Sequence, residues 1–300
     1  MKTNQNNSNS ESLAKQTKKL LQKYEIHLNK KLGQNYLIDD FKRKKIIDFA
    51  ELSKEDVVLE IGPGIGTLTT ELAKKVKKVI AIEQDKKIAD TLKQRIQDES
   101  IENIELINED ALKTDFSKLK YNKIVSNLPY QISSPITFKF LESNLDLAIL
   151  MYQKEFAERM IAKTGYKNYS RLSAMLYFKA DIEFLDNVSP ESFIPRPKVD
   201  SSVVKLSPKN ILDTKTDKSL SSENFEVYSK VCKAIFPHKN KKIRNALIDS
   251  RHILGYNDKK ELRDLIDSNS SLEPFLLNRV ITTSPEEILD LAIILKSIIK

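Results

Sequence analysis

The sequence contains few of the residues that cross-link small secreted domains. It has one cysteine, Cys232, so no internal disulfide can form. No run of about eighteen apolar residues occurs, which excludes a transmembrane helix. The first residues are polar and lack the apolar stretch of a secretory signal. We therefore expect a protein of the reducing cytoplasm that has no membrane partner.

Metal-binding patterns are also missing. The three histidines and the cysteine are spread along the chain, so no metal site is predicted. Apolar residues make up 40% and charged residues 31% of the 300 positions, which describes an ordinary globular protein of one large or two modest domains. The net charge of +8 fits a polyanionic partner, but a solvated lysine-rich surface explains it equally well.

Glycine is scarce, and half of it lies in one turn. Of six glycines, Gly62, Gly64 and Gly66 fall in EIGPGIGT at 60–67. They follow the apolar segment VVLEI at 57–61 and precede leucines that are spaced as on a helix face. Glycine at a strand-to-helix turn permits unusual backbone dihedral angles and lets a ligand approach the main chain. Such turns are typical of nucleotide-binding α/β folds.

The spacing of these glycines distinguishes between ligands. A dinucleotide fingerprint needs glycine where the chain has Thr67, and the Gly-Lys-Ser/Thr of a phosphate-binding P-loop is absent. The pattern E-x-G-x-G-x-G resembles motif I of S-adenosylmethionine-dependent methyltransferases. Glu83 ends the next predicted strand, where a carboxylate can accept hydrogen bonds from both ribose hydroxyls of a nucleoside. Asp110 follows the third strand, where it could accept from an adenine amino group, and a helix cap is its alternative role.

Apolar segments alternate with helical patterns in the first half of the chain. This alternation predicts an α/β, Rossmann-like domain with a mostly parallel sheet and helices on both faces. Ser134 and Pro135 are expected to cap and begin the helix before the fifth strand. Segments at 181–188 and 201–207 are expected to form a hairpin at the sheet edge. The five core strands are predicted at 57–61, 79–83, 104–108, 123–127 and 147–151.

The chain is predicted to have three parts. Residues 1–25 form an N-terminal extension that is flexible at first and then a short basic helix. Residues 26–208 form the methyltransferase-like domain. Residues 209–300 begin with a polar linker and form a small all-helical domain, in which Ser284 starts a capping box before the last helix.

The tetrapeptide NLPY at 127–130 follows the fourth predicted strand, at the edge where open α/β sheets bind ligands. A tight turn is the simpler interpretation. Behind a methyltransferase-like motif I, NLPY also resembles the signature of enzymes that methylate exocyclic amino groups of nucleobases. The Asn127 side-chain oxygen and the Leu128 carbonyl would hold the two amino hydrogens, and Pro129 would stiffen the turn. Tyr130 offers a stacking ring for a base that must be unpaired or flipped out.

Six longer stretches extend the likeness. They are KKLGQNYL at 30–37, EIGPGIGTLT at 60–69, NLPYQISSP at 127–135, YQKEFAERM at 152–160, SRLSAMLYF at 170–178 and FIPRPKVDSSVV at 193–204. Together they resemble the small-subunit (16S-type) rRNA adenine N6-dimethyltransferases, the KsgA type. The segment TKKLLQKYEIHLN that precedes them resembles the lead-in of archaeal members.

The resemblance implies a specific reaction. Four methyl groups would pass from S-adenosylmethionine, without a metal, to two adjacent adenosines in the 3′-terminal hairpin loop of small-subunit rRNA. The partner would be the pre-small ribosomal subunit late in its assembly, and we expect the protein to be a monomer. Phe193 would stack on the adenine face opposite Tyr130, with packing on the sheet edge as its alternative role. The implied cofactor contacts are Asn35, Leu37, Gly62, Gly64, Glu83, Asp110 and Asn127.

The C-terminal part departs from the family pattern in one place. Family members often carry RRKTLRNxL where this chain has PHKNKKIRNAL at 237–247. The basic character remains, and a solvated basic face is the alternative interpretation. The candidates for binding RNA phosphates are Lys239, Lys241, Lys242 and Arg244.

Three other functions stay open. The first is an adenine methyltransferase that acts on large-subunit rRNA or DNA, against which the FIPRPKVDS loop and the long helical tail argue. The second is a non-catalytic assembly factor, which should have lost Asn127 or Glu83, and both are present. The third is a nicotinamide-dependent dehydrogenase, which Thr67 disfavours.

Overall fold

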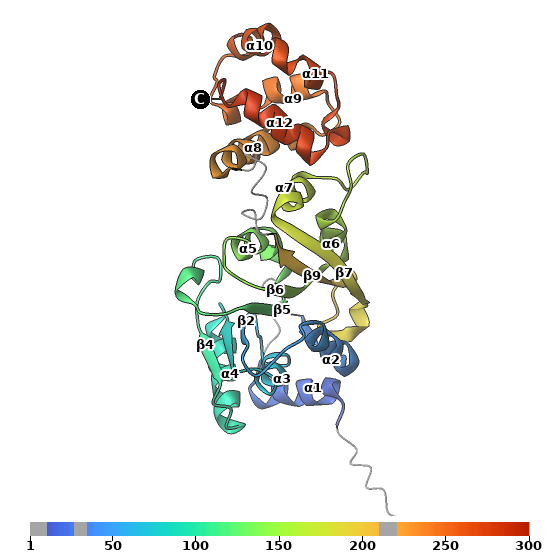
Figure 1. Ribbon diagram of the computed structural model, residues 1–300. Coiled ribbons are helices and arrows are strands. Elements are labelled where there is room, and N and C mark those ends of the chain that lie inside the picture. The colour runs from blue at the N-terminus through green and yellow to red at the C-terminus, as the bar shows by residue number, and fades with distance from the viewer. Residues whose placement is uncertain (1–10, 27–34, 210–220, 300) are drawn as a thin grey trace, which may run out of the picture. The chain divides into compact units, whose positions relative to one another are not determined.

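The computed structural model describes residues 11–26, 35–209 and 221–299 (Figure 1). Within it the chain divides into two compact units. Unit 1 comprises Met1–Lys154 and Glu183–Ser207, and unit 2 comprises Glu155–Ile182 and Pro208–Lys300. Across the described ranges, no helix is long and apolar enough to cross a membrane. The stretch predicted to be flexible, residues 1 to about 11, lies outside the described residues except for Glu11.

Unit 1 is built on a seven-stranded sheet with the order β4-β3-β2-β5-β6-β9-β7. The first five strands of this order pair in parallel, and β9 pairs antiparallel with β6. This confirms the predicted mostly parallel sheet, and β7 and β9 lie side by side at its edge as expected. The strands are β2 (Val57–Ile61), β3 (Lys78–Ile82), β4 (Ile104–Ile107), β5 (Lys123–Asn127), β6 (Leu147–Gln153), β7 (Ala180–Val188) and β9 (Ser201–Pro208).

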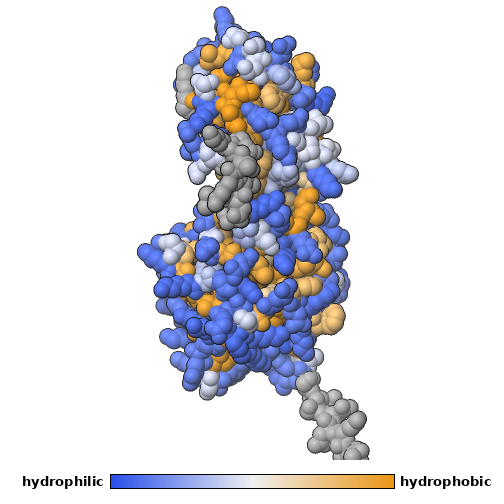
Figure 2. Space-filling view, viewed as in Figure 1, coloured by the Kyte–Doolittle hydropathy of each residue, from blue (hydrophilic) through white to orange (hydrophobic). Residues whose placement is uncertain are grey.

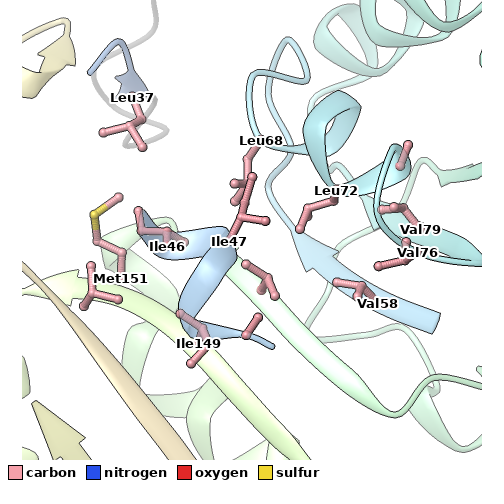
Figure 3. Close-up of a cluster of buried hydrophobic side chains, with 14 of the residues drawn as sticks. Leu37, Ile46, Ile47, Val58, Leu68, Leu72, Val76, Val79, Ile149 and Met151 are labelled. Carbon is pink, nitrogen blue, oxygen red and sulfur yellow. The ribbon is translucent and has the colours of Figure 1, made fainter. Parts of the chain in front are cut away.

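Helices cover both faces of this sheet, which explains why its strands are nearly continuous apolar runs. Figure 1 shows α5 on the opposite side of the sheet from α2 and α3. Ile46 and Ile47 of α2 and Leu72 of α3 pack against Val58 and Ile149 of the sheet in one buried cluster (Figure 3). The helices of unit 1 are α1 (Leu13–Lys23), α2 (Asp40–Phe49), α3 (Thr69–Ala73), α4 (Lys86–Asp98) and α5 (Ser133–Phe140).

The start of α5 differs from the prediction that Ser134 caps it. The helix begins two residues earlier than expected, at Ser133 instead of Pro135, and the residue at its N-cap position is Ile132. A 3₁₀ turn, Tyr130–Ile132, leads directly into it. The Ser133 hydroxyl donates to the Tyr130 carbonyl at 3.0 Å, so the chain coming from NLPY is already coiled when the helix starts. Pro135 therefore lies inside the first turn, where a proline costs no hydrogen bond.

Unit 2 is helical in its described part, apart from short stretches of β7 and β9. It includes α6 and α7, which the sequence analysis assigned to the domain at 26–208. The reason is tertiary: Tyr228 donates to the Ala174 carbonyl at 2.8 Å, and Tyr169 donates to the Thr283 carbonyl at 3.1 Å. The helices are α6 (Lys154–Met160), α7 (Arg171–Lys179), α8 (Ser222–Ile235), α9 (Ile243–Asp249), α10 (Lys259–Ser268), α11 (Glu273–Leu276) and α12 (Pro285–Leu295).

The last helix begins as predicted. The Ser284 hydroxyl accepts from the Glu287 amide at 3.2 Å, and the Glu287 carboxylate accepts from the Ser284 amide at 2.7 Å. This reciprocal pair is the capping box expected from the sequence. Outside the packed interiors, hydrophilic residues cover most of the visible face of each unit, with hydrophobic residues in small patches among them (Figure 2).

Candidate active site

A cavity of about 390 Å³ opens at the carboxyl ends of the parallel strands of unit 1. Its size suits a small-molecule ligand, and its place is where open α/β sheets bind one. Phe193 is the one predicted catalytic or cofactor residue that does not line it. The predicted residues along its wall are Asn35, Leu37, Gly62, Gly64, Glu83, Asp110, Asn127, Leu128, Pro129 and Tyr130.

The glycine turn forms one wall of the cavity, in the conformation that its composition predicted. Gly62, Gly64 and Gly66 all have positive φ, at +68°, +57° and +83°. L-residues with a side chain rarely adopt such angles. At Gly64 there is also no room, because a Cβ there would lie 2.5 Å from Cε1 of Tyr36. Half of the chain's glycines are therefore needed to form this one turn.

Two arginines that were not predicted from the sequence donate hydrogen bonds to main-chain carbonyls of this turn. Arg95 of α4 donates from Nη1 to the Ile65 carbonyl at 2.8 Å. Arg43 of α2 donates from Nη1 to the Thr67 carbonyl at 3.1 Å. Both side chains are largely buried, so these charge-assisted bonds form in a medium where they are strong. We infer that the two guanidinium groups fix the backbone of the turn on both sides of Gly66.

Glu83 connects the end of β3 to the glycine turn. Its carboxylate accepts from the Gly64 amide at 3.2 Å and from the Asp85 amide at 3.0 Å. Burial raises the pKa of the Glu83 carboxyl, because the charged form is poorly solvated there. The main-chain bonds fix the carboxylate at the cavity wall, where it can accept hydrogen bonds from a ribose.

Asp110 lies where a ligand in the cavity could reach it. It lines the cavity, and its Oδ1 accepts from the Leu112 amide at 2.9 Å. The bond closes a turn at 111–113, so Asp110 does not cap a helix as its alternative role required. It also fixes the orientation of the carboxylate, so that a ligand amino group can donate to it from the cavity.

The charge of the cavity wall is one-sided. Five acidic residues line it, and none of the described lining residues is basic. A negative wall suits a cation and opposes the phosphates of a dinucleotide or a nucleoside triphosphate. S-adenosylmethionine carries a sulfonium and an ammonium group and therefore fits this wall. The acidic residues are Glu60, Glu83, Asp85, Glu109 and Asp110.

Glu60 is the strongest sign of a cationic ligand. Its side chain is 2% exposed, and its Oε2 has no hydrogen-bond partner among the described residues. Burial raises the pKa of Glu60 to about 8. The hydroxyl of Tyr36, which also lines the cavity, lacks a partner among the described residues too. Buried orphan polar groups are costly, and a cation or donor in the cavity would satisfy them.

Replacing Glu60 with glutamine should change how folding stability depends on pH. Because the folded-state pKa is about 8 rather than 4.5, the folded, cofactor-free protein holds a proton at Glu60 that the unfolded chain has released. The stabilisation is complete below the lower value and is lost as pH rises through the higher one. Urea unfolding over this range should show a steeper fall in the wild type than in Glu60→Gln. Identical pH profiles would show that the carboxyl is not held uncharged.

The turn Asn127–Tyr130 lies beside the glycine turn, and both line the cavity. A Cβ on Gly62 would lie 3.0 Å from Cγ of Pro129, so two motifs that are far apart in sequence are in direct contact. The Asn127 amide nitrogen donates to the Asn35 carbonyl at 3.0 Å. This bond orients the side-chain amide and leaves its Oδ1 to act as an acceptor. The Tyr130 and Ser201 hydroxyls are 2.6 Å apart, which fixes the position of the tyrosine ring.

Phe193 is placed differently from the prediction that it stacks on the base. It belongs to β8 (Phe193–Ile194), which pairs antiparallel with β1 (Tyr36–Leu37). The Phe193 side chain is 2% exposed and packs in the hydrophobic cluster of unit 1. The structure thus supports the alternative role, in which Phe193 packs in the interior and its strand pairs with the one that carries Tyr36 and Leu37 to the cavity.

The basic residues predicted to bind RNA lie in unit 2, and two of them have acidic partners. Lys241 is 2.8 Å from a carboxylate oxygen of Asp249, and Arg244 donates from Nε to Asp267 at 2.6 Å. Lys239 donates to the Lys167 carbonyl at 2.7 Å. Lys242 is exposed at the start of α9 and has no acidic partner among the described residues.

No group of three or more histidine, cysteine, aspartate or glutamate side chains in the described ranges could hold a metal ion. The cavity is lined by carboxylates, the Asn127 amide, main-chain carbonyls and tyrosines. These groups accept hydrogen bonds from amino and hydroxyl groups, and they favour positive charge.

Comparisons with known proteins agree with this chemistry. Residues 26–270 match the family model "Ribosomal RNA adenine dimethylase". The "Probable ribosomal RNA small subunit methyltransferase A" of Methanosphaera stadtmanae is 49% identical over 93% of this chain and 98% of that protein. Its counterpart in Methanothermobacter thermautotrophicus is 45% identical over 92% of this chain and 94% of that protein.

Solved structures give the same result. A dimethyladenosine transferase from Plasmodium falciparum is 31% identical, with a TM-score of 0.70 over 87% of this chain and 97% of that one. The 23S rRNA methyltransferase ErmE is 28% identical, with a TM-score of 0.60 over 86% of this chain and 98% of that one. This chain belongs to the ribosomal RNA adenine dimethylase family.

Proposed function

We propose that this enzyme methylates N6 of two adjacent adenosines in the 3′-terminal hairpin loop of small-subunit rRNA to N6,N6-dimethyladenosine, and that it does so during subunit assembly. The main support is that the Asn127–Tyr130 turn and the glycine turn with Glu83 line one cavity. A group held by the first turn and a nucleoside held by the second are thus brought together. We expect the protein to work as a cytoplasmic monomer on the pre-small subunit.

The cofactor supplies a methyl group that is already activated by a sulfonium. The protein residues therefore have to bind, orient and exclude water, and they need no strong base or metal. Glu83 and Asp110 would accept from the ribose and the adenine of the cofactor. Glu60 and the acidic wall would favour its positive charge, and the Gly62–Gly64 backbone would let it approach closely.

The target adenine would be held by the second turn. Its amino group is a weak nucleophile, because the nitrogen lone pair is delocalised into the ring. Asn127 Oδ1 and the Leu128 carbonyl would accept the two amino hydrogens and favour a pyramidal nitrogen with a localised lone pair. Each transfer forms one N–C bond and breaks one S–C bond, and one proton leaves N6 for solvent. Tyr130 would stack on the base, which must be unpaired or extruded.

The specificity for the small subunit has a competitor. The likeness to ErmE means that a fold of this kind also serves methylation of 23S rRNA. The higher identity to the two archaeal proteins, whose names specify the small subunit, favours the proposed substrate.

Mass spectrometry of rRNA can decide between these substrates. Small and large ribosomal subunits that lack adenine dimethylation would be incubated separately with the full-length protein and isotopically labelled S-adenosylmethionine. We expect label in two adjacent adenosines of one fragment from the 3′ end of the small-subunit rRNA. Label in large-subunit RNA alone would assign the enzyme to the competing substrate, and no label in either would leave it a non-catalytic binding protein.

A further inference from the structure

Three loops of unit 2 that are far apart in sequence form one surface. They are residues 163–167, 239–242 and 278–282. The Gly165 amide donates to the Ile281 carbonyl at 2.7 Å, and the Ile281 amide donates to the Lys239 carbonyl at 2.8 Å. Lys239 also reaches the first loop, where its ammonium group donates to the Lys167 carbonyl. These bonds connect the first loop to the two loops of the C-terminal part.

This surface is strongly basic. The three loops contain no acidic residue. Asp249 of α9 faces Lys241 and also pairs with Lys259. In the part of the chain that the structure describes, the other five basic residues have no ion-pair partner. The basic residues of the loops are Lys163, Lys167, Lys239, Lys241, Lys242 and Arg279.

An aromatic ring projects from the same surface. Tyr166 is 64% exposed and follows Gly165, whose φ of +88° makes the turn. The backbone of this turn is held without the ring, because the Tyr166 amide donates to the Lys163 carbonyl and the Tyr169 amide donates to the Tyr166 carbonyl. A ring that is mostly exposed buries little apolar area and therefore contributes little to folding stability.

Tyr169, three residues further on, shows what a structural tyrosine looks like in this loop. It is 1% exposed, its hydroxyl donates to the Thr283 carbonyl, and its ring meets the edge of Phe236 at a centroid distance of 5.3 Å. Tyr166 makes none of these contacts. Its position among lysines instead fits a stacking platform beside groups that bind phosphates.

We propose that this surface binds an unpaired strand of RNA, with one base stacked on Tyr166 and the neighbouring phosphates on the lysines and Arg279. An unpaired strand is favoured over a duplex because the ring can stack only on a base whose face is open. The proposal extends the predicted basic cluster at 239–244 to a loop between α6 and α7 and adds a stacking residue. That the RNA is small-subunit rRNA rests on the proposed function.

The test compares the affinity of the full-length protein for a fluorescently labelled single-stranded RNA and for a hairpin duplex of the same length. Tyr166→Ala should weaken binding to the single strand by about five- to a hundredfold. Tyr166→Phe keeps the ring and should bind within about twofold of the wild type. Losing Lys163 and Lys242 together should make the salt dependence less steep, by about 0.7 in log–log slope per lysine. Lys260→Ala, on α10, is the matched control.

Two results would overturn the proposal. One is equal affinity of the wild type and Tyr166→Ala for the single strand. The other is a pair of findings: the wild type binds the duplex more tightly than the single strand, and every variant weakens binding of both RNAs by the same factor. Unchanged cofactor affinity and melting temperature would show that Tyr166→Ala is folded. If the protein methylates neither ribosomal subunit but Tyr166→Ala still binds the single strand more weakly, the proposed function fails and this surface stands.

Discussion

Replacing Asn127 with alanine should lower the methylation rate at saturating rRNA and cofactor by about a hundredfold or more. The change removes one of two acceptors that hold the amino group in the transition state, and losing one such preorganised partner typically costs 10²–10³ in rate. The bond from Asn127 to the Asn35 carbonyl is what orients the acceptor oxygen. Single-turnover kinetics with labelled cofactor would measure the effect on chemistry alone.

A conservative variant separates the two functions of this amide. Asn127→Asp keeps an acceptor oxygen but loses the donor to the Asn35 carbonyl. It should retain more activity than Asn127→Ala and less than the wild type. Because Asn127 also lines the cofactor cavity, the cofactor affinity of both variants has to be measured beside the rate. Turnover near the wild-type value in Asn127→Ala would remove this residue from the catalytic machinery.

Replacing Glu83 with alanine should weaken cofactor binding by about ten- to a hundredfold. A hydrogen bond to a charged group contributes about 1.5–3 kcal/mol, so net loss of one such bond to the ribose has an effect of this order. The variant also loses the bonds that the carboxylate accepts from Gly64 and Asp85. Isothermal titration calorimetry with S-adenosylmethionine would give the change in Kd.

Glu83→Gln is the control for shape. It preserves a side-chain oxygen that can accept from the Gly64 amide, so the glycine turn keeps its support. Its cofactor affinity should lie between those of the wild type and Glu83→Ala. Unchanged affinity in Glu83→Ala would refute the assignment of this carboxylate to the ribose.

The core of the fold could be predicted from sequence because local and long-range signals agree there. Val58 and Leu59 of β2 are fully buried, and a strand buried on both faces needs a continuous apolar run. The positive φ angles at the turn need glycine. Because the chain contains few glycines, their clustering marks the position of the turn in the sequence. Strand ends then placed Glu83 and Asn127 beside that turn, because the carboxyl ends of parallel strands share one edge.

The residues that were missed act through contacts that leave no local pattern. Arg43 and Arg95 reach main-chain carbonyls of the glycine turn from two different helices. In the sequence, neither differs from an ordinary arginine on a helix surface. Glu60 is the first residue of the glycine motif, so its position is plain in the sequence. Its burial is not, because it depends on the packing of α3 and β3 around it. That its Oε2 lacks a hydrogen-bond partner among the described residues could not be read from the motif alone.

Two misplacements have tertiary causes as well. Helices α6 and α7 lie between β6 and β7 in sequence, but buried tyrosine contacts attach α7 and its preceding loop to the C-terminal helices. Phe193 lies in a loop-like sequence with two prolines, which suggests exposure. The pairing of Leu37 with Phe193 turns that segment into a short strand and buries the ring. A single sequence does not reveal such a pairing between segments that are more than 150 positions apart.

The most direct test of the account is a crystal structure of the protein with S-adenosylhomocysteine and an adenosine-containing RNA bound. We expect the target amino nitrogen within about 2.7–3.2 Å of Asn127 Oδ1 and of the Leu128 carbonyl oxygen. It should also face the cofactor's sulfur, in line for a methyl group about 3–3.5 Å away. An adenine bound outside the turn 127–130, or with its amino group directed away from the sulfur, would contradict the account.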